Sequence, residues 1–230
     1  MPLHIGVVGC SAEGAALCYR TICAEGPSTL GEHAHPEITI HTPSLAEYVR
    51  HLDNGDLESV ARLMLASAQK LESAGADFLI CPDNTIHQAF NLVEPVSPLP
   101  WLHIAQVVAE SAAATGFGRV GIMGTHWLTK SSVYPDALAA VGISAVVPAT
   151  NDIDDMGRII MQELVGGRFI PRSIDRLRAI IDRFGADGCD AVVLGCTELP
   201  LVLDSNNCTL PILDSTRILA RAALARAAMS

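Results

Sequence analysis

The segment Cys196-Thr197-Glu198 places a thiol beside a hydroxyl and a carboxylate, directly after an apolar run at residues 191–194. Such a run predicts a buried strand, so that Cys196 stands at a strand end where a thiol is partly accessible. The alternative is a buried structural cysteine, because cysteine is among the most buried residue types. A thiol with hydrogen-bonding neighbours can act as an acid or a base. We therefore take Cys196 as a candidate catalytic group.

The same arrangement occurs earlier in the chain, with a carboxylate in place of the thiol. Residues 74–85 and 187–198 align as a repeat with an offset of 113, which sets Asp83 at the position of Cys196. The segment 6–11 recurs at 121–126 with an offset of 115. A repeat of half the chain length predicts two similar halves. Because both halves carry a polar residue at the corresponding position, the repeat favours a functional role over plain burial.

Apolar strand patterns alternate with amphipathic helical patterns, as in parallel sheets covered by helices. We expect strands near residues 3–9, 38–42, 77–81, 120–123, 143–147 and 190–194. We expect helices near residues 12–25, 56–74, 103–115, 131–141, 152–165, 172–186 and 214–228. The predicted fold class is α/β, with two pseudo-symmetric parallel-sheet domains and the active site between them.

Proline residues indicate the boundaries between the two domains. Three prolines fall in residues 94–100, a sequence that disfavours a helix and suits a linker, and a second crossing is expected near Pro211. We expect a first domain of residues 1–100 plus 210–230 and a second domain of residues 101–209. Ligands of open α/β sheets bind outside the carboxyl ends of the strands. Four loops are therefore expected to form the site: 9–14, 81–87, 124–130 and 195–200.

The composition restricts the classes of partner. The formal net charge is −10, which disfavours nucleic acid and anionic membrane surfaces, so that a small anionic substrate needs a local arginine or backbone-amide cradle. The chain has no apolar run of about 18 residues and opens without a signal sequence, which predicts a cytoplasmic protein. Its seven cysteines include no Cys-x-x-Cys pair, which favours free thiols over disulfides or structural zinc.

Binding groups are harder to assign from residue type alone. The loop Gly9-Cys10-Ser11 has the glycines of a phosphate loop without its Lys-Ser/Thr pair, so we expect its backbone amides either to hold a carboxylate or to form a plain strand-to-helix turn. Arg50 and Arg168 are candidates for a substrate carboxylate, because guanidinium groups pair with carboxylates through two hydrogen bonds. Surface solvation is the alternative for both.

The chain resembles the aspartate/glutamate racemases. Gly195-Cys196-Thr197-Glu198-Leu199-Pro200 is similar to their second catalytic motif, and Pro82-Asp83-Asn84-Thr85-Ile86-His87 is similar to their first, usually Pro-Cys-Asn-Thr-x-His. The resemblance extends over most of the chain. It implies two groups on opposite faces of a substrate α-carbon, one removing a proton and the other returning it, without pyridoxal phosphate or metal.

The resemblance also implies roles for individual residues. Cys196 and Asp83 would be the catalytic pair. The expected substrate-binding residues are Gly9, Cys10, Ser11, Asn84, Thr85, Thr125, Thr197, Glu198 and Arg50. Ordinary loop capping is the alternative for the amide and hydroxyl groups among them. The implied partners are an amino acid or dicarboxylic acid and a second copy of the chain.

Two positions depart from the family pattern. Asp83 replaces the first cysteine, and Cys81, two residues earlier, is expected to lie deeper on the same strand face and to be structural. Leu219 stands where a histidine is expected. An aspartate of ordinary pKa near 3.9 is a weaker base than a thiolate of pKa near 8.5, so the two faces are expected to be unequal.

Three functions are compatible with these residues. The first is racemisation or epimerisation of an acidic or small polar amino acid without a cofactor. The second is a one-cysteine decarboxylase or cis-trans isomerase acting on a dicarboxylic acid, which the change to Asp83 favours. The third is a carboxylate-binding regulatory protein that has lost turnover.

Overall fold

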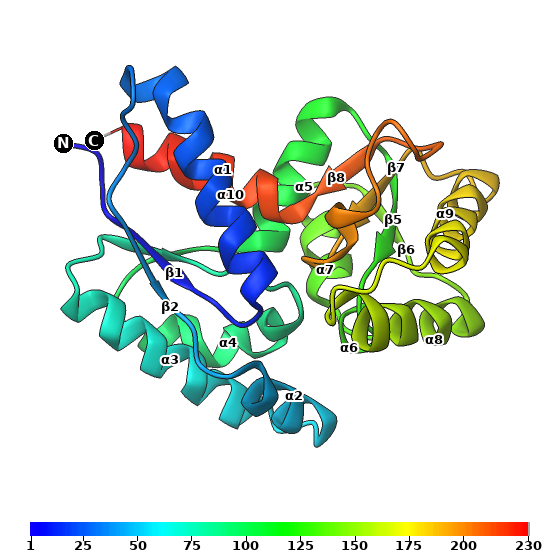
Figure 1. The fold of residues 1–230 in the computed structure, drawn as a ribbon, viewed down its shortest axis with the longest axis horizontal. Helices are drawn as coiled ribbons and strands as arrows, with labels where there is room; N and C mark the ends of the chain where they lie inside the picture. Colours follow the sequence, from blue (N-terminus) through cyan, green and yellow to red (C-terminus); the bar gives the residue numbers. More distant parts are fainter. Residues whose placement is uncertain (230) are drawn as a thin grey trace. The chain divides into compact units, whose positions relative to one another are not determined.

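The computed structural model describes residues 1–229 and divides into two compact units. The first unit is Met1–Val107 together with the chain from Thr216 onward, and the second is Val108–Ser215. The predicted domain boundaries, after residues 100 and 209, stand a few residues before these two crossings. Figure 1 shows helices around a sheet in each unit.

The first unit is built on a parallel sheet with the strand order β2-β1-β3-β4. Its strands are β1 (Ile5–Val8), β2 (Ile38–His41), β3 (Phe78–Ile80) and β4 (Trp101–Leu102). β1 lies between β2 and β3, with Ile5 beside both Ile38 and Phe78. The loops that follow β1 and β3 are therefore neighbours at the carboxyl edge of the sheet.

Helices cover both faces of the first sheet. They are α1 (Ala12–Leu30), α2 (Leu45–Asp53), α3 (Leu57–Ser73), η1 (Thr85–Ala89), α4 (Phe90–Val93), η2 (Glu94–Val96) and α10 (Ser215–Ala228), together with the start of α5 (Ile104–Thr115), which continues into the second unit. Cys18 and Ile22 of α1 share a buried cluster with Leu219 and Ala223 of α10 and with Ile5 of β1. Figure 1 shows α1 and α10 side by side on this face. Leu219, which replaces the family's histidine, is thus a core residue.

The second unit repeats this plan. Its parallel sheet has the strand order β6-β5-β7-β8. The strands are β5 (Arg119–Met123), β6 (Ser144–Val146), β7 (Ala191–Leu194) and β8 (Ile212–Asp214). The repeated segments fall on β1 and β5 and on β3 and β7, which are equivalent strands. The predicted fold class of two similar parallel-sheet α/β halves is confirmed.

The helices of the second unit include one irregular segment. They are α6 (His126–Thr129), α7 (Val133–Ala140), α8 (Thr150–Ile159), η3 (Ile160–Leu164), α9 (Pro171–Ala186) and η4 (Leu199–Leu201). η3 is a π-helical continuation of α8. Apolar residues of α8, η3 and α9 bury one face of β7.

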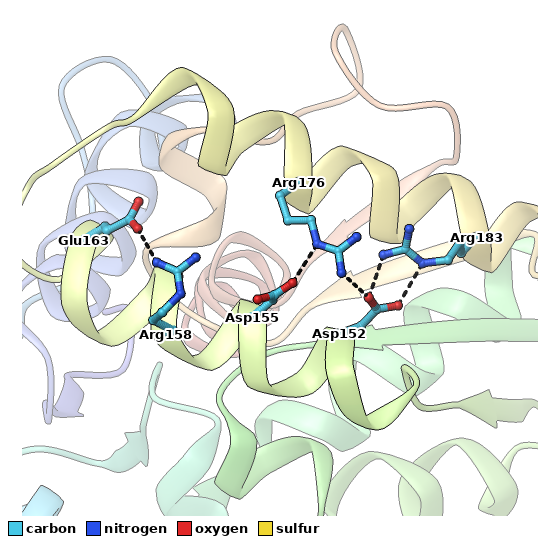
Figure 2. A network of polar contacts seen from close by, with 6 residues as sticks. All are labelled: Asp152, Asp155, Arg158, Glu163, Arg176 and Arg183. Carbon is cyan, nitrogen blue, oxygen red and sulfur yellow. Dashed lines mark hydrogen bonds and ion pairs between the residues drawn. The ribbon is translucent and has the colours of Figure 1, made fainter.

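An ion-pair network fixes α8 against α9 (Figure 2). The buried Asp152 accepts hydrogen bonds of 2.8 and 2.7 Å from Nε and Nη2 of Arg183, and one of 2.9 Å from Nη2 of Arg176. Nε of Arg176 also donates to Asp155 at 2.8 Å. Guanidinium groups that share a carboxylate or contact it through two hydrogen bonds fix the relative position of two helices better than isolated surface ion pairs do. The network therefore stabilises the layer that supports β7.

Several observed elements were not predicted, among them the short helices η1, α4, α6 and η4. α2 was not expected, and neither were the short edge strands β4 and β8. The predicted linker at 94–100 contains the short helix η2 and leads into β4. None of the helices within residues 1–229 has the length and hydropathy needed to cross a membrane.

Candidate functional site

The first half-site is centred on the carboxylate of Asp83, which follows β3. Its Oδ2 accepts hydrogen bonds from the backbone N–H of Cys10 at 3.0 Å and of Ser11 at 3.2 Å, and its Oδ1 lies 3.1 Å from the Ser11 nitrogen. Asp83 is buried. In this structure the amide cradle predicted in the first loop holds a carboxylate of the chain itself.

The local sequence explains why the first loop presents these amides. Ser11 is the N-cap of α1, and its Oγ accepts a hydrogen bond from the Gly14 nitrogen at 3.1 Å. The amides that precede a helix are unpaired within it and favour a negative charge. Gly9 allows the loop to approach β2, because a Cβ there would lie 2.2 Å from Cγ2 of Thr42.

A buried aromatic cluster supports the backbone of Asp83. Nδ1 of His87 lies 3.0 Å from the carbonyl oxygen of Asp83, and since a carbonyl only accepts, this nitrogen carries the proton. The ring of His87 stacks on Phe90 and meets His103 edge to face at 4.7 Å. Burial, together with His103, holds the pKa of His87 well below its usual range. Burial also lowers the pKa of His103 to about 4. Both imidazoles are neutral at pH 7.

The environment of Cys81 is consistent with the structural role predicted for it. It is fully buried, and its Sγ lies 3.7 Å from the carbonyl oxygen of Asp83. Burial, followed by the charge of Asp83, raises the pKa of the Cys81 thiol well above its ordinary value. A thiolate is therefore strongly disfavoured at this position.

Asn84 and Thr85 lie beside Asp83, and the structure adds Tyr48 to this half-site. Asn84 is buried and occupies the N-cap position of η1, whose first residue is Thr85. The side chain of Tyr48 in α2 is fully buried, and its hydroxyl makes no hydrogen bond among the described residues. Burial, with the charges of Cys81, Cys10 and Asp83, raises the pKa of Tyr48. The helical spacing of apolar residues at 45, 48, 49 and 52 was the signal that could have revealed α2 and Tyr48.

Neither predicted arginine, Arg50 or Arg168, makes a hydrogen bond or ion pair with the described residues around Asp83. Arg50 is exposed on α2, where its Nη2 lies 3.2 Å from the ring nitrogen Nε2 of His51. Arg168 is exposed after η3 in the second unit, and its guanidinium donates to the carbonyl oxygen of Gln162.

The second half-site is centred on the thiol of Cys196, which follows β7. Its Sγ lies 2.9 Å from Oε2 of Glu198, and the same oxygen accepts a hydrogen bond of 2.8 Å from Oγ1 of Thr197. All three side chains are buried. The predicted neighbours of the thiol thus form a connected group, in which the carboxylate is able to take the thiol proton.

Close backbone packing positions this group. The Gly195 nitrogen donates to the Met123 carbonyl oxygen at 2.7 Å. A Cβ on Gly195 would lie 2.6 Å from Cδ2 of Leu128 and 2.9 Å from that same carbonyl oxygen. Thr125 caps α6 by accepting a hydrogen bond of 3.3 Å from the Leu128 nitrogen. The loops after β5 and β7 therefore pack directly on each other.

A metal site is not formed by the described residues. Within residues 1–229, no three histidine, cysteine, aspartate or glutamate side chains are grouped so that they could hold an ion. The chemistry visible in the two half-sites is that of thiols, carboxylates and hydroxyls.

The Asp/Glu/Hydantoin racemase family model matches residues 5–223. Among curated proteins, the broad specificity amino-acid racemase RacX of Bacillus subtilis is 24% identical over 193 residues, covering 81% of this chain and 80% of its own length. A glutamate racemase of Parafrankia sp. is 29% identical over 152 residues, covering 64% of this chain. The chain spans about half the length of the glutamate racemases it matches.

Solved structures are similar over the whole chain. An Asp/Glu racemase structure from Yersinia pestis superposes with a TM-score of 0.89 and 29% identity, covering 99% of this chain and 100% of its own. An aspartate racemase homologue from Pyrococcus horikoshii gives a TM-score of 0.82 and 26% identity, covering 97% and 98%.

Proposed function

Because the chain belongs to the Asp/Glu/hydantoin racemase family, we propose that it racemises or epimerises an acidic or small polar amino acid without a cofactor. Racemases are isomerases, and this family membership makes the chain an isomerase of amino acids. The substrate and the roles of individual residues belong to the proposal.

The contact between Cys196 and Glu198 is the observation that supports this function most directly. A buried thiol 2.9 Å from a carboxylate oxygen can pass its proton to that oxygen and act as a thiolate base. Thr197 donates to the same oxygen and keeps it turned toward the thiol. We assign Cys196 as the acid/base group for one face of the α-carbon, with Glu198 as its proton partner.

The first half-site, which is centred on Asp83, is proposed to supply the other face, in line with the repeat. Its carboxylate receives backbone N–H groups from Cys10 and Ser11, and such hydrogen bonds favour the ionised form. An ionised carboxylate is a weak base toward a C–H proton. The two faces should therefore exchange protons at different rates.

Short polar side chains and backbone amides around the two groups are proposed to bind substrate. Gly9, Cys10, Ser11, Asn84, Thr85, Thr125 and Thr197 offer amides, hydroxyls and a carboxamide suited to an α-carboxylate or an amino group. Arg50 is proposed for a side-chain carboxylate, which a rotamer change of this exposed residue would have to bring into reach.

The proposed activity is tested by washing solvent deuterium into the α-position of each enantiomer of a panel of amino acids. We expect exchange with at least one acidic or small polar amino acid, unchanged by chelators and without pyridoxal absorbance. Absence of exchange across the panel would contradict the proposal.

A one-cysteine decarboxylase or cis-trans isomerase acting on a dicarboxylic acid is the second candidate. The observation in its favour is that Asp83 replaces the first motif cysteine and is held by backbone amides. The same deuterium experiment, extended to dicarboxylic acids with product analysis, separates the two. Conversion of a diacid without amino-acid exchange would establish this alternative.

We also propose that the chain is a cytoplasmic homodimer, as the family resemblance implies. Light scattering coupled to gel filtration should give twice the chain mass of 24.3 kDa. A monomer mass at micromolar concentration would contradict the dimer.

A further inference from the structure

We infer that Cys10 is the acid/base thiol of the first half-site, and that Asp83 is the positioning carboxylate beside it. The observation behind this assignment is the hydrogen bond of 3.0 Å between the Cys10 backbone nitrogen and Oδ2 of Asp83. The inference rests on the proposed racemase function and changes which group of the first half-site handles the proton.

The contacts of Asp83 suit a fixed charge better than a C–H base. Both carboxylate oxygens lie within 3.2 Å of backbone nitrogens at the start of α1. These donors, and the dipole of a 19-residue helix, stabilise the negative charge. A base that is stabilised in its ionised form gains little from taking a proton.

The position of Cys10 suits it to exchange a proton with the substrate α-carbon. Covalent geometry keeps a cysteine Sγ within about 4 Å of its own backbone nitrogen, so the Cys10 thiol lies within about 7 Å of the Asp83 oxygen that this nitrogen contacts. The exposed fraction of Cys10 is 7%, the same as that of Cys196. Because β1 pairs with β3, the thiol and the carboxylate come from adjacent strand ends.

The other cysteines of the first unit do not fit this role. Cys18 and Cys81 are fully buried, and the pKa of Cys81 is raised well above its ordinary value by burial. Cys23 lies on α1 beside Tyr19, away from the strand ends. Cys10 is thus a first-unit cysteine that, like Cys196, is buried without being fully enclosed and follows a strand beside a carboxylate.

The second half-site shows the same pairing with the positions exchanged. There the thiol occupies the motif position and its carboxylate, Glu198, follows two residues later. In the first half-site the carboxylate occupies the motif position, and the thiol comes from the neighbouring loop. Each half-site therefore holds one thiol and one carboxylate, although neither the order nor the loop is the same.

Tyr48 gives independent support for a ligand at this place. Its hydroxyl is buried and makes no hydrogen bond of good geometry among residues 1–229, although Ser67 lies close enough to lower its pKa, while a buried polar group ordinarily has a partner. The charges of Cys81, Cys10 and Asp83 raise the pKa of Tyr48. A polar group of a bound substrate would supply the missing partner.

The proton balance involves the two thiols, while Asp83 stays ionised. Cys10 begins as a thiolate, its proton having left to solvent. The thiolate takes the α-proton, and the electron pair of the C–H bond stays on the α-carbon. The Cys196 thiol, which donates to Glu198, then gives its proton to the opposite face. Cys10 is now a thiol and Cys196 a thiolate, and the reverse reaction begins from that state.

The test compares deuterium wash-in from each enantiomer for Cys10→Ala, Cys10→Ser, Asp83→Asn and Cys23→Ser. Both Cys10 variants should lose at least about 100-fold of the wash-in from one enantiomer and keep that from the other. Asp83→Asn should lose less, because the thiol remains. Cys23→Ser, the matched control on α1, should keep both rates. Full wash-in from both enantiomers in Cys10→Ala and Cys10→Ser would overturn the inference.

A second measurement does not depend on the substrate. Alkylation of folded protein by iodoacetamide, followed by mass spectrometry of the peptide that contains Cys10, gives the pH at which this thiol becomes reactive. Asp83→Asn should move that pH downward, because a neighbouring negative charge disfavours a thiolate. An unmoved pH would overturn the pairing. If wild-type protein exchanges no amino acid, the proposed function fails while the alkylation result still decides the pairing.

Discussion

The half-sites of the two units share a backbone plan but differ in what their carboxylates contact. Asp83 is held by backbone N–H groups of Cys10 and Ser11, whose protons cannot be transferred under ordinary conditions. Glu198 is held by the thiol of Cys196 and the hydroxyl of Thr197. The proton on that thiol can move to the carboxylate.

This difference shows that the repeat conserves the scaffold rather than the proton chemistry. Equivalent strands, β1 with β5 and β3 with β7, bring the same loops to the edge of each sheet. The side chains at these edges then determine whether a charge is fixed or a proton is mobile.

Replacement of Cys196 by alanine should have the largest effect. The variant loses the thiol whose proton Glu198 accepts, and wash-in on that face should fall by about 10³-fold. Wash-in of deuterium is measured separately from each enantiomer. Cys208→Ala, at a half-buried cysteine of the same unit, is the control and should keep both rates. An unchanged rate in Cys196→Ala would remove the basis of the racemase mechanism.

Replacement of Gly195 by alanine should destabilise the second unit by about 2–3 kcal/mol. The new Cβ would lie 2.9 Å from the Met123 carbonyl oxygen, and this backbone atom of β5 has little freedom to move. The free energy of unfolding is measured in urea. Gly185→Ala on α9 is the matched control, because its Cβ would meet Leu210 at an ordinary 3.7 Å and alanine favours a helix.

The corresponding change in the first half-site is Gly9→Ala, and its effect on stability can be compared with that of Gly195→Ala. A Cβ on Gly9 would meet Cγ2 of Thr42, which is a side-chain atom and can rotate away. Gly9→Ala should therefore cost less than Gly195→Ala. A larger loss for Gly9→Ala would show that the first loop is the more tightly packed of the two.

Much of this scaffold is readable from the sequence. The apolar runs before Asp83 and Cys196 predict β3 and β7, and the repeat predicts the shared plan of the two units. The edge strands β4 and β8 escape prediction because two or three residues carry no periodicity, and only their pairing with β3 and β7 defines them. The π-helical η3 likewise has no local signal.

The sequence predicts the contacts of the site less well than it predicts the residues that form it. Asp83 and Cys196 were singled out from their positions, and Glu198 from its place beside the thiol. The amide donors of Asp83 come from residues 72 and 73 positions away, so that only the adjacency of β1 and β3 brings them together. Tyr48 was missed because α2 was not predicted, and the unpaired state of its hydroxyl is visible only in three dimensions.

Glu198→Gln should slow wash-in on the Cys196 face by about 30-fold, because glutamine cannot take the thiol proton. Loss of the proton acceptor should at the same time slow alkylation of Cys196 at pH 7, because fewer Cys196 thiols are ionised. A merely structural role for Glu198 would leave the alkylation rate of Cys196 unchanged. Glu110→Gln, at an exposed position of α5, is the control and should change neither.

The smallest expected effect is an acid sensitivity located in the first unit. Burial lowers the pKa of His103 to about 4, whereas an unfolded chain binds this proton near a pKa of 6.5. Between these values the unfolded state binds more protons, so the stabilisation is complete above pH 6.5 and is lost as the pH falls toward 4. His87, whose pKa is also lowered by burial, acts in the same direction. The second unit contains one histidine, His126, against seven in the first.

We therefore expect the first unit to lose about 1 kcal/mol of stability between pH 7.5 and 5.5, measured by hydrogen exchange of peptides from each unit. His103→Asn is the matched variant. Nδ1 of His103 accepts hydrogen bonds from the Ala105 and Gln106 nitrogens, and an asparagine oxygen can replace this cap without titrating. The variant should lose part of the acid sensitivity of residues 78–107 and leave peptides of the second unit unchanged. Equal acid sensitivity in wild-type and His103→Asn protein would show that the buried imidazoles are not its source.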